Sequence, residues 1–139
     1  VVFVNGASDR SEYRKFKMRH QKNDDTANMR EVITRRLKHK EWTLPDLIIV
    51  DGAEGQIRAV KDLLAEAHIP VIGRDKSGDH SKNAAVSVVF PDPKDKSSFC
   101  TVRLPSGSHI AKLIARIDEE SHRFAITYHR LLKRKSLLK

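Results

Sequence analysis

Residues 44–56 read LPDLIIVDGAEGQ, and within them the acidic residue Asp51 ends an apolar stretch. Asp51 follows the run DLIIV (46–50), whose continuous hydrophobicity predicts a short strand buried on both faces. The carboxyl ends of such strands form the ligand-binding edge of open α/β sheets. A carboxylate there can hold a hard divalent cation. Asp51 could instead cap a turn, or a helix beginning near residue 54, so both interpretations stay open.

Two consecutive carboxylates, Asp24 and Asp25, stand where a helix is expected to begin. A carboxylate at that place accepts hydrogen bonds from free backbone N–H groups and interacts favourably with the helix dipole. A pair is more than one cap requires. One of the two is therefore available for another role.

His122 lies in a long helix expected over residues 108–138. At about 100° per residue it lies roughly 140° around the helix from Ile117, well off the apolar stripe. It is therefore either solvated or turned toward a cleft beside the small residues Ala111 and Ala115. A neutral imidazole can bind a divalent metal or transfer a proton near neutral pH. Three of the seven histidines fall in this helix, so the position alone does not decide between these interpretations.

Several common catalytic patterns are missing from the sequence. Residues 52–56, GAEGQ, lack the lysine and the spacing of a phosphate-binding loop. There is no serine nucleophile elbow and no H-E-x-x-H metal motif. Carboxylates and a histidine on a basic chain fit metal-assisted phosphodiester cleavage, in which cations neutralise the phosphate and activate a water.

The charge of the chain favours a polyanionic partner. There are 27 Lys and Arg against 18 Asp and Glu, a net charge of +9. Basic residues also support the end of a helix, but the last helix carries more than that role needs. We expect them to contact phosphates, with an affinity that falls steeply as salt rises. These residues are Arg123, Arg130, Lys133, Arg134, Lys135 and Lys139.

The expected elements form one α/β domain over residues 1–139, with a mixed sheet and helices on both faces. A strand at 1–4, a turn at Asn5-Gly6 and an antiparallel strand at 11–20 come first. Apolar periodicity then predicts helices at 26–41, 54–68 and 108–138. The apolar stripe of the last helix is Ile110, Leu113, Ile114, Ile117, Phe124 and Tyr128. Further strands are expected at 46–50, 69–73, 84–90 and 98–104, with a polar loop at 74–83.

Cysteine content and hydropathy restrict the cellular setting. With only Cys100, no disulfide framework can form within the chain, which fits a reducing, cytoplasmic compartment. No apolar run approaches the ~20 residues needed to span a membrane, and no signal peptide is visible.

Five segments resemble, in order and spacing, the carboxyl-terminal half of UvrC, the incision subunit of bacterial nucleotide excision repair. The resemblance covers essentially the whole chain, and the VDG…GQ and ESHRFAI segments are its most specific parts. The segments are YRKFKMR (13–19), DDTANM (24–29), LPDLIIVDGAEGQ (44–56), PVIG (70–73) and IDEESHRFAITYHR (117–130).

The resemblance implies a ribonuclease H-like nuclease domain that cuts damaged double-stranded DNA on the 5′ side of a lesion, using Mg²⁺ or Mn²⁺. It implies an active site of Asp25, Asp51 and His122 with a further acidic residue nearby, where His122 is a metal ligand or a general acid or base. UvrB would be a partner, mainly through regions outside this chain. The setting would be the response to DNA damage, including the SOS response.

The sequence also departs from the family pattern. The family's first catalytic aspartate lies on a strand that would precede Val1, so a truncated domain that lacks the first strand, and is inactive by itself, is expected. Ala53 and Glu54 replace a glycine and a lysine, and Asp118-Glu119-Glu120 replaces R-D-E. By the same resemblance, the family's helix-hairpin-helix module is expected to lie outside these 139 residues. The alternative is a non-catalytic basic DNA-binding module of the same fold, while an enzyme of transposition or junction cleavage does not fit the HRFAI segment.

Overall fold

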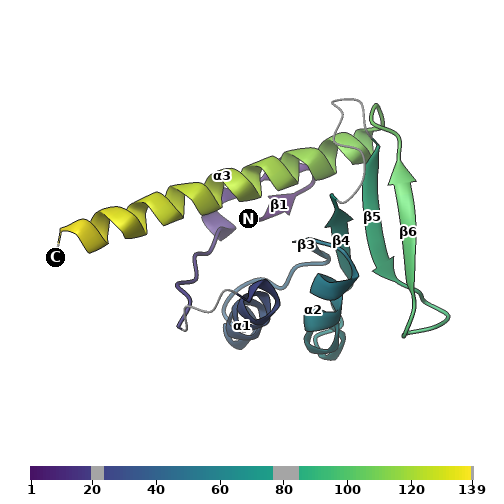
Figure 1. The fold of residues 1–139 in the computed structure, drawn as a ribbon, viewed down its shortest axis with the longest axis horizontal. Coiled ribbons are helices and arrows are strands. Elements are labelled where there is room, and N and C mark those ends of the chain that lie inside the picture. The colour runs from purple at the N-terminus through teal and green to yellow at the C-terminus, as the bar shows by residue number, and fades with distance from the viewer. Residues whose placement is uncertain (20–23, 77–84, 139) are drawn as a thin grey trace. The chain divides into compact units, whose positions relative to one another are not determined.

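The computed structural model describes residues 1–19, 24–76 and 85–138, drawn as the coloured ribbon in Figure 1. The chain divides into two compact units, which are described separately. The smaller unit combines residues 1–16 with residues 107–139, and the larger unit comprises residues 17–106.

A four-stranded mixed sheet organises the larger unit. Its strands are β3 (Ile48–Asp51), β4 (Val71–Asp75), β5 (Val86–Pro91) and β6 (Phe99–Leu104). They lie in the order β3-β4-β5-β6, with β3 and β4 parallel and the other pairs antiparallel. The predicted mixed α/β fold and the predicted hairpin are confirmed. Residues 77–83 of the predicted loop, and residue 84 of the predicted strand, fall outside the described residues.

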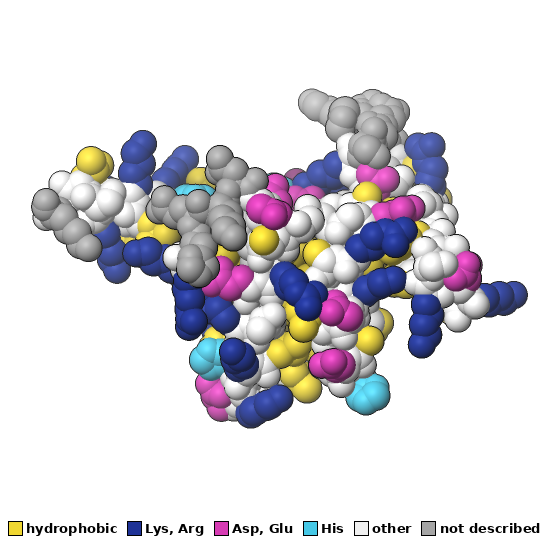
Figure 2. All heavy atoms as spheres, turned by 60° about the horizontal axis from the view of Figure 1, so that its bottom comes forward, with side chains coloured by type: hydrophobic (Ala, Val, Ile, Leu, Met, Phe, Trp, Pro, Cys, Tyr) yellow, Lys and Arg dark blue, Asp and Glu magenta, His cyan; other side chains and the backbone are white. Residues whose placement is uncertain are grey.

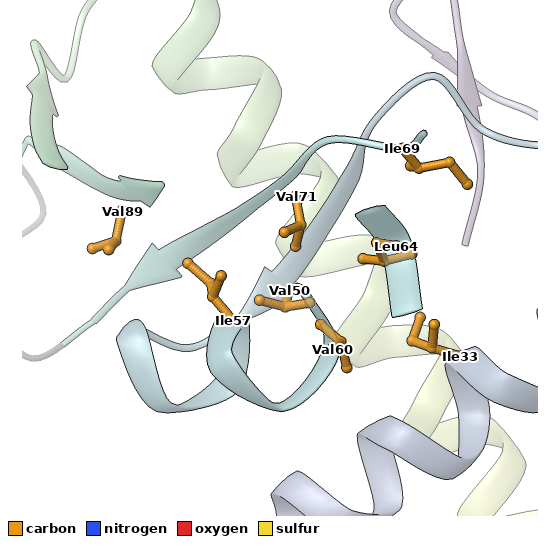
Figure 3. Close-up of a cluster of buried hydrophobic side chains, with 8 residues drawn as sticks. All are labelled: Ile33, Val50, Ile57, Val60, Leu64, Ile69, Val71 and Val89. Carbon is orange, nitrogen blue, oxygen red and sulfur yellow. The ribbon is translucent and has the colours of Figure 1, made fainter. Parts of the chain in front are cut away.

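The core of this unit lies between the sheet and two helices, α1 (Asp25–Lys38) and α2 (Glu54–Glu66). Helix α2 joins β3 to β4, and three of its side chains, Ile57, Val60 and Leu64, are fully buried. Figure 3 shows them meeting the strand residues and Ile33 of α1. Among the described residues, no polar or charged residue is buried as a whole. Apolar burial is therefore what holds the helices on the sheet.

Helix α1 ends at Lys38, three residues before the predicted end at 41. His39 closes the helix, and its ring stacks on Trp42 with 3.8 Å between centroids. The Nδ1 of His39 is also 2.7 Å from the Glu41 carboxylate. These side-chain contacts turn the chain away from the helix axis. In the first half of α1, Arg30 forms a bidentate ion pair with Asp62 of α2, with N–O distances of 2.9 and 3.0 Å.

The smaller unit begins with a tight hairpin of β1 (Phe3–Val4) and β2 (Ala7–Ser8). Asn5 and Gly6 form its turn with positive φ angles, as the sequence predicts. The predicted strand at 11–20 is wrong over its described residues, 11–19. The Asp9 carboxylate accepts the Ser11 N–H and starts a 3₁₀ turn, η1 (Arg10–Glu12), after which the chain has no regular structure.

The long helix α3 (His109–Leu137) is capped by Ser108 and carries the rest of the smaller unit. The chain after η1 follows it, because the Tyr13 ring packs edge-on against Phe124 with 5.1 Å between centroids. The apolar stripe predicted for this helix is wrong at Ile110, which is 54% exposed. Ile114 is buried as predicted, and so is Ala111, which the predicted stripe did not include. The other members of the stripe are half-buried.

Candidate metal centre

Asp51 is the last residue of β3, at the carboxyl end of a strand that is buried at Val50. Its side chain is 49% exposed. Ala53, not Asp51, occupies the N-cap position of α2. Gly52 makes the turn with φ 155°, a conformation that a side chain would strain. The sheet therefore fixes the backbone of Asp51 while its carboxylate faces outward.

Asp25 and Asp51 share one hollow in the larger unit, with a volume of about 390 Å³. Asp25 comes from the first turn of α1 and Asp51 from the end of β3. The hollow is therefore acidic and offers hard oxygen donors. Its lining residues are Asp25, Asn28, Met29, Val32, Asp51 and Gln56.

The neighbouring carboxylates at the start of α1 have separate tasks. Asp24 is the N-cap residue, and its Oδ1 accepts the backbone N–H groups of Thr26 and Ala27, both at 3.1 Å. Asp25 lines the hollow instead. Asp24 alone therefore caps the helix, and a role of Asp25 at a metal ion stays a prediction.

Gln56 tests whether the hollow fits a cation. Its Oε1 is buried and accepts no hydrogen bond from any described residue. A buried acceptor without a donor is costly, and a metal ion or a metal-bound water could satisfy it. Two carboxylates and one orphan amide oxygen are the donor set that Mg²⁺ and Mn²⁺ prefer. The residues of the hollow therefore fit a divalent cation.

Lys76 is a site residue that sequence reasoning missed. It follows the last residue of β4, and its Nζ lies 3.0 Å from Oδ1 of Asp51. Arg74 is the register partner of Asp51 across the parallel strands, so Lys76 stands two residues further along at the same sheet edge. Its place directly after a strand parallel to β3 is the signal that could have identified it.

His122 lies on α3 in the smaller unit, off the buried line of that helix. Its Nε2 is 3.7 Å from Oδ1 of Asp118, one turn earlier on the same face. The Asp118 side chain is only 15% exposed, whereas that of His122 is 55% exposed. An imidazole and a carboxylate thus stand side by side, and both can bind a metal. Whether His122 meets the Asp25 and Asp51 carboxylates at one ion stays a prediction.

Arg123, a predicted nucleic-acid contact, pairs with Glu120 through two hydrogen bonds of 2.8 and 2.5 Å. Glu120 also accepts the hydroxyl of Tyr13 at 3.1 Å. The hydrogen bonds from Arg123, supported by Tyr13, lower the pKa of Glu120 to about 2. Glu120 therefore joins the beginning of the chain to α3 through Tyr13, and Arg123 holds the Glu120 carboxylate in addition to any contact with DNA.

The other predicted nucleic-acid contacts are exposed, except Lys139, which lies outside the described residues. Figure 2 shows Lys and Arg side chains projecting around the carboxyl-terminal part of α3. Few anionic side chains accompany them there, since no Asp or Glu follows Glu120 in the sequence. The exposed basic residues in question are Arg130, Lys133, Arg134 and Lys135.

Comparison with known proteins decides the family of this chain. The family model described as the UvrC RNase H endonuclease domain matches residues 1–126. The chain belongs to this UvrC domain family. UvrABC system protein C of Streptococcus equi subsp. zooepidemicus is 41% identical, and that of Streptococcus thermophilus is 42% identical. Each match covers 98% of this chain and 23% of the relative, so the chain spans about a quarter of their length.

The matched part of the UvrC domain contains Asp25, Asp51, Lys76 and His122. The four basic residues from Arg130 to Lys135 lie beyond it. The predicted ribonuclease H-like fold and the resemblance to UvrC are confirmed. Among the described residues, no helix has the length and hydrophobicity to cross a bilayer.

Proposed function

We propose that this chain is a metal-dependent endodeoxyribonuclease domain that makes the 5′ incision in nucleotide excision repair. One observation carries the proposal: Asp25 and Asp51, from different elements, line the same hollow in a chain of the UvrC endonuclease family. The orphan Oε1 of Gln56 in that hollow supports it. Damaged double-stranded DNA is the proposed substrate, UvrB the proposed partner and the cytoplasm the proposed location.

Asp51 and Asp25 would hold Mg²⁺ or Mn²⁺, with His122 as a further ligand or as the proton carrier. The cation, when bound, neutralises phosphate charge and favours ionisation of a water. In hydrolysis, a water oxygen bonds to phosphorus and the bond to the leaving ester oxygen breaks. The water loses one proton and the leaving oxygen gains one. His122 can carry either proton, because an imidazole has one ring nitrogen that accepts a proton and one that donates it.

The basic residues of α3 would bind backbone phosphates other than the one that is cleaved. Phosphate contacts of this kind position a duplex without reading its sequence. They suit a nuclease that must accept many sequences around a lesion. Arg130, Lys133, Arg134 and Lys135 are exposed and can reach phosphates directly, whereas Arg123 must share its guanidinium with Glu120.

Replacing Asp51 tests the proposal. We expect the chain to bind Mn²⁺ and Asp51→Asn to weaken that binding at least about tenfold, because the amide removes the charge that attracts the cation. Isothermal titration calorimetry measures the affinity. Asp46→Asn, an exposed residue before β3, is the matched control and should bind Mn²⁺ normally. Equal affinities in all three proteins would contradict the role of Asp51.

A nicking assay distinguishes the proposed nuclease domain from the alternative, a non-catalytic DNA-binding module. We expect the protein to convert supercoiled plasmid to the nicked form with Mn²⁺, and Asp51→Asn to abolish this conversion. Binding of duplex DNA without any nicking by the unsubstituted protein would favour the alternative. The replacement of a family lysine by Glu54 is the feature of this chain that supports it.

A further inference from the structure

Lys76 lies beside the carboxylate of Asp51, the last residue of β3. Its Nζ is 3.0 Å from Oδ1 of Asp51, and the two side chains are 37% and 49% exposed. The contact joins the carboxyl ends of β3 and β4, two parallel strands whose ends meet at one edge of the sheet. Asp51 also lines the hollow that contains Asp25. Lys76 therefore places a positive charge at the rim of an acidic hollow.

Stability of the fold does not explain a lysine at this position. Ion pairs that are this exposed contribute little, because water and salt screen them and two long side chains must be ordered. The strands are held by their own backbone pairing and by the buried side chains beneath them. The chemistry of an ammonium group beside the Asp51 carboxylate is the better explanation.

An ammonium group has three N–H donors and no acceptor. Lys76 therefore cannot bind a cation, and a cation on Asp51 repels it and competes for the same oxygen. When a divalent ion occupies the hollow, the Lys76 ammonium would give up its contact with Asp51 and become available to an anion at the rim. Its four-carbon stem is flexible enough to turn outward. The anionic acceptors that the proposed substrate brings to this rim are phosphate oxygens.

We propose that Lys76 binds a non-bridging oxygen of the phosphodiester at the point of cleavage. This inference rests on the proposed function and adds a substrate-binding residue to it. In the metal-free protein Asp51 holds the ammonium, and metal binding releases it toward the phosphate. Lys76 donates hydrogen bonds and transfers no proton. It stabilises negative charge that grows on the phosphate oxygens as the water oxygen attacks.

Metal binding gives the first test, using the full chain. Lys76→Met removes the competing charge and keeps a long apolar stem. We expect it to tighten Mn²⁺ binding about two- to fivefold in calorimetry, the range for an exposed ion pair. Lys76→Arg should behave like the unsubstituted protein. Lys94→Met is the matched control, because Lys94 lies in the β5–β6 turn, which strand register places at the opposite end of the sheet.

DNA binding gives the second test. With Mn²⁺ present, we expect Lys76→Met to weaken binding of a fluorescein-labelled duplex about tenfold, as the loss of a charged hydrogen bond to phosphate does. With EDTA instead, its affinity should equal that of the unsubstituted protein, since Lys76 is then held by Asp51. Lys94→Met should change both affinities equally or not at all. Fluorescence anisotropy measures both conditions.

The outcomes separate this inference from the proposed function. If Asp51→Asn weakens Mn²⁺ binding but Lys76→Met changes neither Mn²⁺ affinity nor duplex affinity, only the role of Lys76 is wrong. An equal loss of duplex affinity with Mn²⁺ and with EDTA also overturns it, because general charge attraction would explain that result. If Asp51→Asn binds Mn²⁺ normally, the metal centre itself is wrong.

Discussion

Two adjacent aspartates show how local backbone geometry assigns different roles to identical side chains. Asp24 has an extended backbone before the first turn of α1, so its carboxylate folds back onto two N–H groups. Asp25 is already helical, and its side chain reaches the hollow beside Asp51. A shift of one residue along the chain thus separates a structural carboxylate from a candidate metal ligand.

Substituting each aspartate by alanine should separate these roles. Asp24→Ala should lower the free energy of unfolding by about 1 kcal/mol, the usual cost of losing an N-cap, with Mn²⁺ affinity kept. Asp25→Ala should weaken Mn²⁺ binding with little loss of stability. Denaturant unfolding and calorimetry on both variants give the two readouts. A loss of Mn²⁺ affinity in Asp24→Ala but not in Asp25→Ala would contradict the division of roles. The same change of stability and affinity in both variants would contradict it as well.

Among single residues, the sequence pattern drew attention to Asp51 and His122 and to the pair Asp24-Asp25, and the resemblance to UvrC then selected Asp25 from the pair. Lys76 and Gln56 could not be singled out in the same way. The importance of Lys76 depends on strand register, which sets the distance between its Nζ and the Asp51 carboxylate. The importance of Gln56 depends on which hydrogen-bond donors surround its buried Oε1. Neither property is encoded in composition or periodicity.

At the scale of elements, the turn from β3 to α2 is held in place by a glycine of the neighbouring strand. A Cβ on Gly73 of β4 would lie 2.2 Å from the backbone oxygen of Gly52 and 3.1 Å from Ile57 Cδ1. The carbonyl of Gly52 therefore rests directly on β4. This close approach fixes the backbone on which Asp51 stands.

Gly73→Ala should disturb this turn and the site with it. The new methyl group meets backbone that cannot move aside cheaply, so we expect a loss of about 1–3 kcal/mol in the free energy of unfolding and weaker Mn²⁺ binding. Gly55→Ala is the control, because a Cβ there has open space and alanine favours the helix. Denaturant unfolding with calorimetry measures both. A Gly73→Ala protein as stable as the control would refute the close approach.

Elements with strong apolar periodicity were predictable. The three helices and the four strands of the main sheet appear close to their expected ranges, because buried faces impose regular spacing. The expected strand at 11–20 was wrong because Tyr13, Phe16 and Met18, interspersed among charged residues, resemble a strand with one solvated face. The ring of Tyr13 packs on Phe124 of a helix more than a hundred residues later, a tertiary contact that local pattern cannot reveal.

At the scale of the whole molecule, the predicted site residues are divided between the two compact units. Asp25, Asp51 and Lys76 belong to the larger unit, and His122 and its neighbour Asp118 belong to the smaller unit. Periodicity could show that His122 leaves the apolar stripe of its helix. Periodicity could not show which side chains His122 meets, because that depends on how distant segments of the chain fold together.

The most direct test is to ask which side chains touch the ion. Pulsed electron paramagnetic resonance of Mn²⁺ bound to the chain detects a nitrogen ligand through its hyperfine coupling. We expect an imidazole coupling that disappears in His122→Gln and persists in the control His129→Gln, with Mn²⁺ binding itself dependent on Asp51. Bound Mn²⁺ that shows no imidazole coupling, or a coupling that survives His122→Gln, would contradict a shared metal centre.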